Sequence, residues 1–139
     1  MANDIRDIDR IVSEVLAKYP EADEDEIRAE IREYEAAGRE LFVERFDGPC
    51  IEVGHGCAGT YWSDWSPYEI VDVISDKTIE VRPLIASRNF AKWPDQAHIF
   101  FRFEEGSTKR FRKTKRNGWY RNGERLSIAG ASHYRDPSF

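Results

Sequence analysis

Hydrophobic residues recur at every third or fourth position in the N-terminal part of the chain, a spacing that predicts amphipathic helices. The first hydrophobic stripe comprises Ile5, Ile8, Val12, Val15, Leu16 and Tyr19. It predicts a helix from about Asp4 to Lys18, which Pro20 ends. Asp23 with Glu26 three residues later is a helix-capping pattern, and it predicts a second helix that Gly38 stops or weakens. Each helix has one hydrophobic stripe, so both need a surface to pack against.

After Gly48-Pro49 the hydrophobic positions alternate, as they do in β-strands. The dipeptides Asn117-Gly118 and Asn122-Gly123 favour tight hairpin turns. We predict short strands at 50–53, 59–62, 68–74, 77–82, 97–103, 108–116, 119–121 and 124–128. The predicted fold class is therefore α+β, with an acidic helical extension (1–48) followed by an antiparallel barrel or sandwich of six to eight strands (49–139).

A segment without regular pattern, 83–95, interrupts the strands. Pro83 opens it and Pro94 closes it. Loops of this length in a small domain often carry function, so we treat it as a candidate binding segment.

The composition places the chain among folded, soluble proteins. Its 139 residues (16.2 kDa) suit one compact domain, and 40% hydrophobic and 13% aromatic residues are too many for a disordered chain. No stretch is long and apolar enough to cross a membrane, and the N-terminus lacks the pattern of a secretory signal. Two cysteines cannot form a disulfide framework. We therefore expect a cytoplasmic protein, located in the host cytoplasm if a phage encodes it.

The net charge of −5 averages two unlike segments. Residues 1–48 hold 15 acids and 7 bases, whereas residues 49–139 hold 11 acids and 14 bases. Eight of those bases lie between positions 109 and 125, where Glu124 is the single acid. This region is the strongest field of one sign in the chain and indicates an anionic partner.

Metal-binding and catalytic patterns are weak. The possible soft metal ligands are Cys50, His55, Cys57, His98 and His133, and they do not form the two close pairs that a structural zinc site requires. The glycine-rich stretch 54–60 could cradle a phosphate, but a tight connection between strands is the favoured interpretation. No serine or cysteine lies in a recognisable nucleophile pattern. We therefore expect no metal, no cofactor and no enzymatic activity.

The basic strand region and the 83–95 loop together suggest a site for an anionic ligand that contains rings. Arginine pairs with phosphate oxygens through two parallel hydrogen bonds, and aromatic rings stack on bases. The alternative is that the bases protect edge strands and the aromatic rings fill the core. We predict phosphate contacts from the bases, stacking by the two aromatic residues and recognition of a polar edge by the asparagine. The predicted ligand-binding residues are Arg88, Asn89, Phe90, Trp93, Arg110, Arg112 and Lys113.

The stretch from Val53 to Asp64 (VGHGCAGTYWSD), followed by YEIVDVI and KTI, resembles a family of small β-domain proteins of phages and prophages. A C-terminal tail like YRDPSF also recurs in that family. The resemblance covers about 49–139, and the chain departs from the family pattern at His55, where Asp is usual, and at Trp65-Ser66-Pro67. The family is identified with the phage anti-Thoeris nucleotide sponges. The resemblance implies an oligomeric β-rich protein that sequesters a cyclic ADP-ribose-type immune signal without chemistry.

The leading hypothesis is therefore a phage-type protein, a homodimer or higher oligomer, that binds an anionic nucleotide-like ligand and counters bacterial antiviral defence. A second hypothesis is a nucleic-acid-binding β module whose basic strands lie along a phosphate backbone. A third is a protein-directed inhibitor whose acidic helices contact a basic host protein. The helices could also merely cover the barrel or form an oligomer interface.

Overall fold

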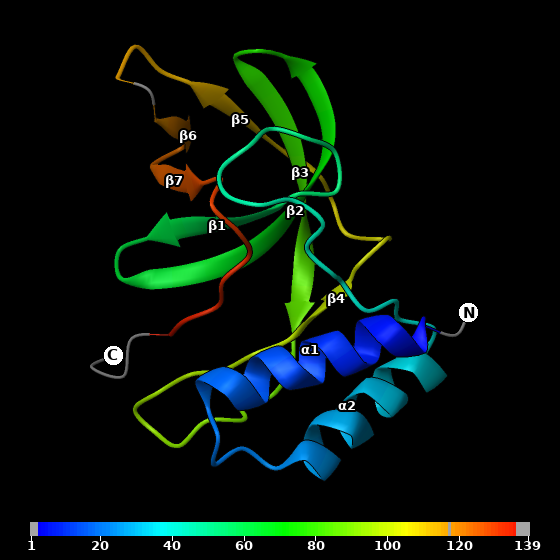
Figure 1. The fold of residues 1–139 in the computed structure, drawn as a ribbon. Coiled ribbons are helices and arrows are strands. Elements are labelled where there is room, and N and C mark those ends of the chain that lie inside the picture. Colours follow the sequence, from blue (N-terminus) through cyan, green and yellow to red (C-terminus); the bar gives the residue numbers. More distant parts are fainter. Residues whose placement is uncertain (1–2, 117, 136–139) are drawn as a thin grey trace. The chain divides into compact units, whose positions relative to one another are not determined.

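The computed structural model, which describes residues 3–116 and 118–135, forms two compact units, each built from two segments of the chain (Figure 1). The helical unit comprises Met1–Val43 and Ile85–Arg102, and the barrel unit comprises Glu44–Leu84 and Phe103–Phe139. Each unit has its own hydrophobic core. Most of the loop predicted at 83–95 thus belongs to the unit that contains the helices.

Both predicted helices are present: α1 spans Ile5–Lys18 and α2 spans Glu24–Ala36. The side chains of Asp4 and Asp23 cap them, each accepting a hydrogen bond from the backbone amide two residues later, at 2.8 and 2.9 Å. These bonds satisfy amide groups that have no partner within the helix. The cap expected at Asp23 is confirmed, whereas Asp4, expected in the first turn of its helix, caps α1 from the position before it.

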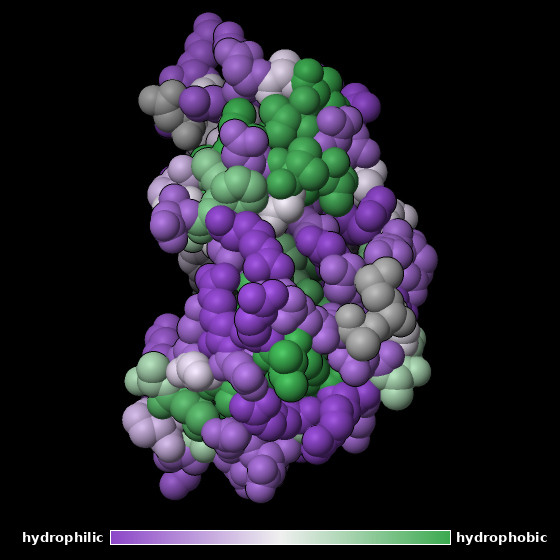
Figure 2. All heavy atoms as spheres, turned by 45° about the vertical axis from the view of Figure 1, so that its right-hand side comes forward, coloured by the Kyte–Doolittle hydropathy of each residue, from purple (hydrophilic) through white to green (hydrophobic). Residues whose placement is uncertain are grey.

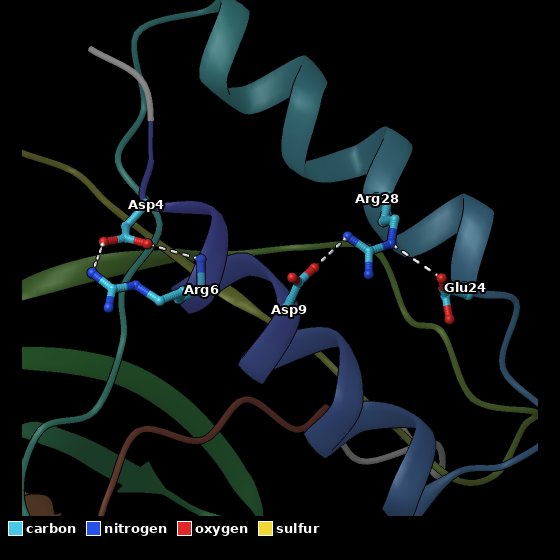
Figure 3. Close-up of polar contacts among 5 residues, drawn as sticks. All are labelled: Asp4, Arg6, Asp9, Glu24 and Arg28. Carbon is cyan, nitrogen blue, oxygen red and sulfur yellow. Dashed lines mark hydrogen bonds and ion pairs between the residues drawn. The ribbon is translucent and has the colours of Figure 1, made fainter.

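An arginine links the two helices at the surface. In Figure 3, the guanidinium of Arg28 lies between the carboxylates of Asp9, at 2.9 Å, and Glu24, at 3.2 Å. At the start of α1, Arg6 lies 3.6 Å from the cap carboxylate of Asp4. Such exposed pairs are screened by solvent, so they orient the helices more than they stabilise them.

The core of the helical unit forms between the hydrophobic stripes and the segment that returns from the barrel. The ring of Phe101, on the short strand β4 (Phe100–Arg102), stacks on Tyr34 with 4.0 Å between centroids. Leu41 forms an isolated bridge to Phe101, and Ile27 and Ile31 are fully buried beside them. The helices therefore pack on a real core, as their hydrophobic stripes require.

The barrel unit is a closed antiparallel barrel of six strands in which chain neighbours are sheet neighbours (Figure 1). β7 pairs with β1 and closes the barrel. An extra strand, β4, lies next to β3 in the sheet order, beyond the point where β3 passes into the helical unit. The strands are β1 (Gly56–Tyr61), β2 (Asp64–Ser75), β3 (Thr78–Ala86), β5 (Lys109–Lys113), β6 (Trp119–Arg121) and β7 (Glu124–Ser127).

Alternation along the strands fills the barrel with hydrophobic side chains. Phe111, Trp119 and Leu126 point inward from β5, β6 and β7 and are buried, while their neighbours point outward. The β6–β7 turn is formed by Asn122 and Gly123, with φ values of 46° and 83°. Both residues are left-handed, as a type I′ turn requires, so this hairpin prediction is confirmed.

Other strand predictions need correction. Residues 50–53 form no strand, and the strand predicted at 97–103 is reduced to β4. The glycine-rich stretch 54–60, expected as a tight connection, is strand from Gly56, because β1 pairs with both β2 and β7; Gly59 lets neighbouring side chains approach its backbone. Asn117, half of the other predicted Asn-Gly turn, lies outside the described residues.

The face drawn in Figure 2 is mostly hydrophilic with hydrophobic patches. No helix among the described residues has the length and hydrophobicity needed to cross a membrane. The large hydrophobic side chains that the described chain exposes are Ile5, Val53, Tyr61, Trp62, Ile74, Trp93 and Tyr120.

Candidate functional site

Two arginines and a tyrosine form a straight row across the outer face of three neighbouring strands. Arg112 of β5 lies directly opposite Tyr120 of β6, and Tyr120 lies directly opposite Arg125 of β7. All three residues are exposed. Directly opposed residues in antiparallel strands have Cβ atoms about 5 Å apart, so the three side chains are immediate neighbours. We call this set the Arg–Tyr–Arg row.

A glycine sets the position of the tyrosine ring in the row. A Cβ atom on Gly118 would lie 2.4 Å from Cε2 of Tyr120 and 2.8 Å from its hydroxyl oxygen. The ring therefore lies against the bare backbone of Gly118, which is itself buried. Tyr120 remains 37% exposed, so part of the ring is open to a ligand.

The guanidinium groups of the row are not neutralised within the described chain. Neither Arg112 nor Arg125 forms an ion pair with a described residue, whereas Arg110 lies 3.3 Å from Glu80. Glu80 also accepts a hydrogen bond from Thr108 at 2.6 Å. The bond from Thr108, and after it the one from Arg110, lowers the pKa of Glu80 below its usual value despite partial desolvation. Arg110 therefore has a structural partner, while the two arginines of the row are available to bind an external anion.

Further bases surround the row without acidic neighbours in the sequence. Lys115 and Arg116 are exposed in the connection to β6, whereas Lys113, opposite Trp119, lies on the other side of β5 from Arg112. Like charges gathered on one face attract a polyanion and raise its association rate. The row and these bases form the most basic described surface of the barrel unit.

A buried polar cluster inside the barrel holds β1, β2, β5 and β7 in position. The hydroxyl of Tyr68 donates a hydrogen bond to Glu124 at 2.7 Å and accepts one from Lys109 at 3.0 Å. Burial, and after it the bond to Glu124, raises the pKa of Tyr68 far above its usual value, so the phenol stays neutral. Gly59 lies directly against this cluster, because a Cβ atom there would meet Glu124 at 2.1 Å.

The predicted residues of the loop belong to the helical unit, and most have structural roles there. The side-chain oxygen of Asn89 accepts hydrogen bonds from the amides of Ala91 and Ala97, and its amide group donates one to Asp95. Phe90 is buried in the core. These contacts account for Asn89 and Phe90 without a ligand.

The other two predicted loop residues lie at the surface. Arg88 pairs with Glu26 at 2.6 Å, and Trp93 is 65% exposed. Arg110, Arg112 and Lys113 belong to the barrel unit instead. The convergence of all seven predicted residues on one ligand stays a prediction.

The histidines considered as catalytic or metal-binding groups are engaged in the fold. His55 is buried, with Nδ1 2.6 Å from a Glu44 carboxylate oxygen and Nε2 against the carbonyl oxygen of Ile128. Nδ1 of His98 lies 2.7 Å from the carbonyl oxygen of Ser87. Within residues 3–116 and 118–135, no group of three or more His, Cys, Asp or Glu side chains is placed to hold a metal ion.

The sequence prediction included Arg112 but did not select Tyr120 or Arg125 as site residues. The missing signal was the register of the β6–β7 hairpin. A two-residue turn at Asn122-Gly123 makes Arg121 face Glu124 and therefore Tyr120 face Arg125. The pairing could thus have been derived from the Asn-Gly motif.

Comparison with known proteins gives no support from relatives: no family model, no curated protein and no solved structure is significantly similar to this chain.

Proposed function

We propose that this protein binds single-stranded nucleic acid on the outer face of β5, β6 and β7 and performs no chemistry on it. The observation that carries the proposal is the Arg–Tyr–Arg row, in which two guanidinium groups without an acidic partner among the described residues flank a partly exposed ring. Guanidinium groups bind phosphates through two parallel hydrogen bonds, and an aromatic ring stacks on any base. The row presents a guanidinium, a ring and a guanidinium in turn, and a single nucleic-acid strand presents phosphates and unpaired bases in turn.

The openness of the row favours a polymer over a small molecule. Small ligands are usually enclosed by a pocket that covers most of their surface. The row instead lies on outward-facing positions of three strands, a surface along which a chain of phosphates can lie. The exposed bases Lys115 and Arg116, in the connection between β5 and β6, add to the positive charge near the row.

Sequestration of a free nucleotide, which the resemblance to the phage sponges implies, uses the same chemistry of phosphate and ring. Under that alternative, arginines of the barrel unit such as Arg110 and Arg112 would contact the phosphates of a compact ligand. A role against bacterial antiviral defence, and a homo-oligomer that encloses the ligand, would follow from it. Binding of a nucleic-acid strand depends more steeply on salt concentration than binding of a free nucleotide, so a salt titration distinguishes the two ligands.

The test is the binding of a fluorescent oligonucleotide of about 16 nucleotides, the upper end of common site sizes, measured by anisotropy across a range of salt concentrations. We expect the double variant Arg112→Ala/Arg125→Ala to bind at least tenfold more weakly, a change of about 1.4 kcal/mol. Loss of two phosphate contacts should also make the slope of log K against log salt less negative by about 1.4, at about 0.7 per contact.

A matched control is Arg110→Ala, which removes a neighbouring arginine that is paired with Glu80. We expect it to change affinity much less than the double variant. Equal affinity of the double variant and the wild type would refute the proposal. Tight binding of a cyclic dinucleotide or cyclic ADP-ribose with a shallow salt slope, and none of the oligonucleotide, would favour the sponge alternative.

A further inference from the structure

The loop between β1 and β2 carries two large aromatic side chains into solvent. Trp62 is 83% exposed and Tyr61 is 57% exposed. Their rings stand nearly perpendicular, with 6.3 Å between centroids and an interplanar angle of 79°. These two residues are not explained by the hydrophobic core of the barrel.

Folding alone disfavours a tryptophan at this position. Trp62 has a φ of +59°, a left-handed conformation that glycine adopts freely and bulky residues rarely adopt. The side chain gains little from burial in return, because most of it is exposed. Unfavourable backbone conformation combined with an exposed aromatic ring is typical of residues that are kept for binding.

The loop also borders a shallow pocket that is open to solvent. Among the described residues, its lining consists of Tyr61, Trp62, Ser63 and Asp64, and its volume is about 290 Å³. This volume is at the lower end for small-molecule pockets and suits one planar ring system. The charged group in that lining is an acid, so the cavity disfavours a phosphate and is compatible with an uncharged base.

The loop continues the Arg–Tyr–Arg row. Thr60, the residue before Tyr61 in β1, lies directly opposite Arg125, the last residue of the row. The ring of Tyr61 reaches the β6–β7 turn, because its Cε2 atom lies 3.8 Å from the position of a Cβ on Gly123. Alternation along β1 places Tyr61 on the opposite side of the strand from Thr60, so a nucleic-acid strand bound along the row would reach the two exposed rings by passing around the β6–β7 turn.

We propose that the Tyr61–Trp62 loop is a base-binding subsite that stacks one unpaired base of a single strand whose phosphates lie on Arg112 and Arg125. The inference rests on the proposed function and adds a residue-specific contact to it. The row supplies the phosphate contacts and the loop supplies the preference for an unstacked base. Duplex DNA, whose bases are paired and stacked, cannot make the second contact.

The variant Trp62→Gly in the full chain tests the subsite, because glycine suits the local φ and should keep the fold intact. We expect its affinity for the 16-nucleotide single strand to fall about 5- to 150-fold, the range for losing one stacked base. The salt slope should stay as in the wild type, since no phosphate contact is lost. Trp62→Phe keeps a ring and should retain most of the affinity.

Two controls separate this inference from the proposed function. Ile74→Ala removes an exposed hydrophobic side chain of β2 that belongs to neither the row nor the loop, and it should leave the affinity for the single strand unchanged. An abasic oligonucleotide should bind wild type and Trp62→Gly equally, because it offers phosphates without bases. If Trp62→Gly binds the single strand as tightly as the wild type, the subsite is overturned and the row is not. If the double variant Arg112→Ala/Arg125→Ala binds the single strand as tightly as the wild type, the proposed function is overturned.

Discussion

Replacing Gly59 with alanine should disrupt the polar cluster inside the barrel. A Cβ atom at this position would lie 2.1 Å from a carboxylate oxygen of Glu124 and 2.6 Å from Cε2 of Tyr68. Ordinary van der Waals contact begins at about 3.5 Å, so both groups have to move by about 1 Å or more. Moving Glu124 breaks its 2.7 Å hydrogen bond with the buried Tyr68 hydroxyl.

The magnitude follows from two costs and one gain. A hydrogen bond to a charged group contributes about 1.5–3 kcal/mol, and forcing a methyl group into a packed site costs about 1–3 kcal/mol. Alanine in a strand recovers about 0.5–1 kcal/mol relative to glycine. We therefore expect Gly59→Ala to lower the free energy of unfolding by about 2–5 kcal/mol, measured by urea denaturation with tryptophan fluorescence.

A double-mutant cycle with Glu124→Ala tests the mechanism. If the alanine methyl acts mainly by displacing the carboxylate, removing that carboxylate first relieves part of the clash. The double variant should then be less destabilised than the sum of the two single variants, by about 1 kcal/mol or more. Additive effects, or a Gly59→Ala variant within about 0.5 kcal/mol of the wild type, would refute the reasoning.

Two other predictions concern side chains whose environment the structure defines. Gly118→Ala should displace the Tyr120 ring, since the new Cβ would lie 2.4 Å from its Cε2 atom. We expect weaker oligonucleotide binding and an intact barrel by circular dichroism. Unchanged affinity would contradict the role of the ring. Burial raises the pKa of the Cys57 thiol from about 9 to about 12. The folded state therefore keeps this proton where the unfolded state loses it, so the associated stability is complete below pH 9 and is lost as the pH rises toward 12. A thiol reagent at pH 8 should label the partly exposed Cys50 and spare Cys57 in the native protein, and labelling of both at equal rates would show that the assigned burial is wrong.

The sequence predicted the fold well where local chemistry decides the structure. The capping aspartate Asp23 and the turn at Asn122-Gly123 each satisfy backbone requirements through their own side chain or conformation. Such signals depend on a few neighbouring residues and need no knowledge of tertiary contacts. The α+β class and the small antiparallel barrel follow from them.

The predicted site was harder, because the sequence does not show which face a loop residue takes. Phe90 looked available for stacking, but it fills the core beneath the helices. Asn89 looked available for a base edge, but its amide group closes the loop on itself through three hydrogen bonds. Both outcomes depend on contacts that close only when the loop packs against the rest of its unit.

Charge also misleads when it is summed along the chain. The barrel unit contains 12 acids and 12 bases, so it is neutral as a whole. Its polarity arises from arrangement: Lys109 and Arg110 lie beside acids, whereas Arg112 and Arg125 stand on the outer face without an acidic partner among the described residues. In the helical unit, by contrast, Arg28 bridges two carboxylates. The strand register decides which basic side chains have an acidic partner and which do not. A barrel unit with no net charge can therefore carry a basic surface, which the net charge does not reveal.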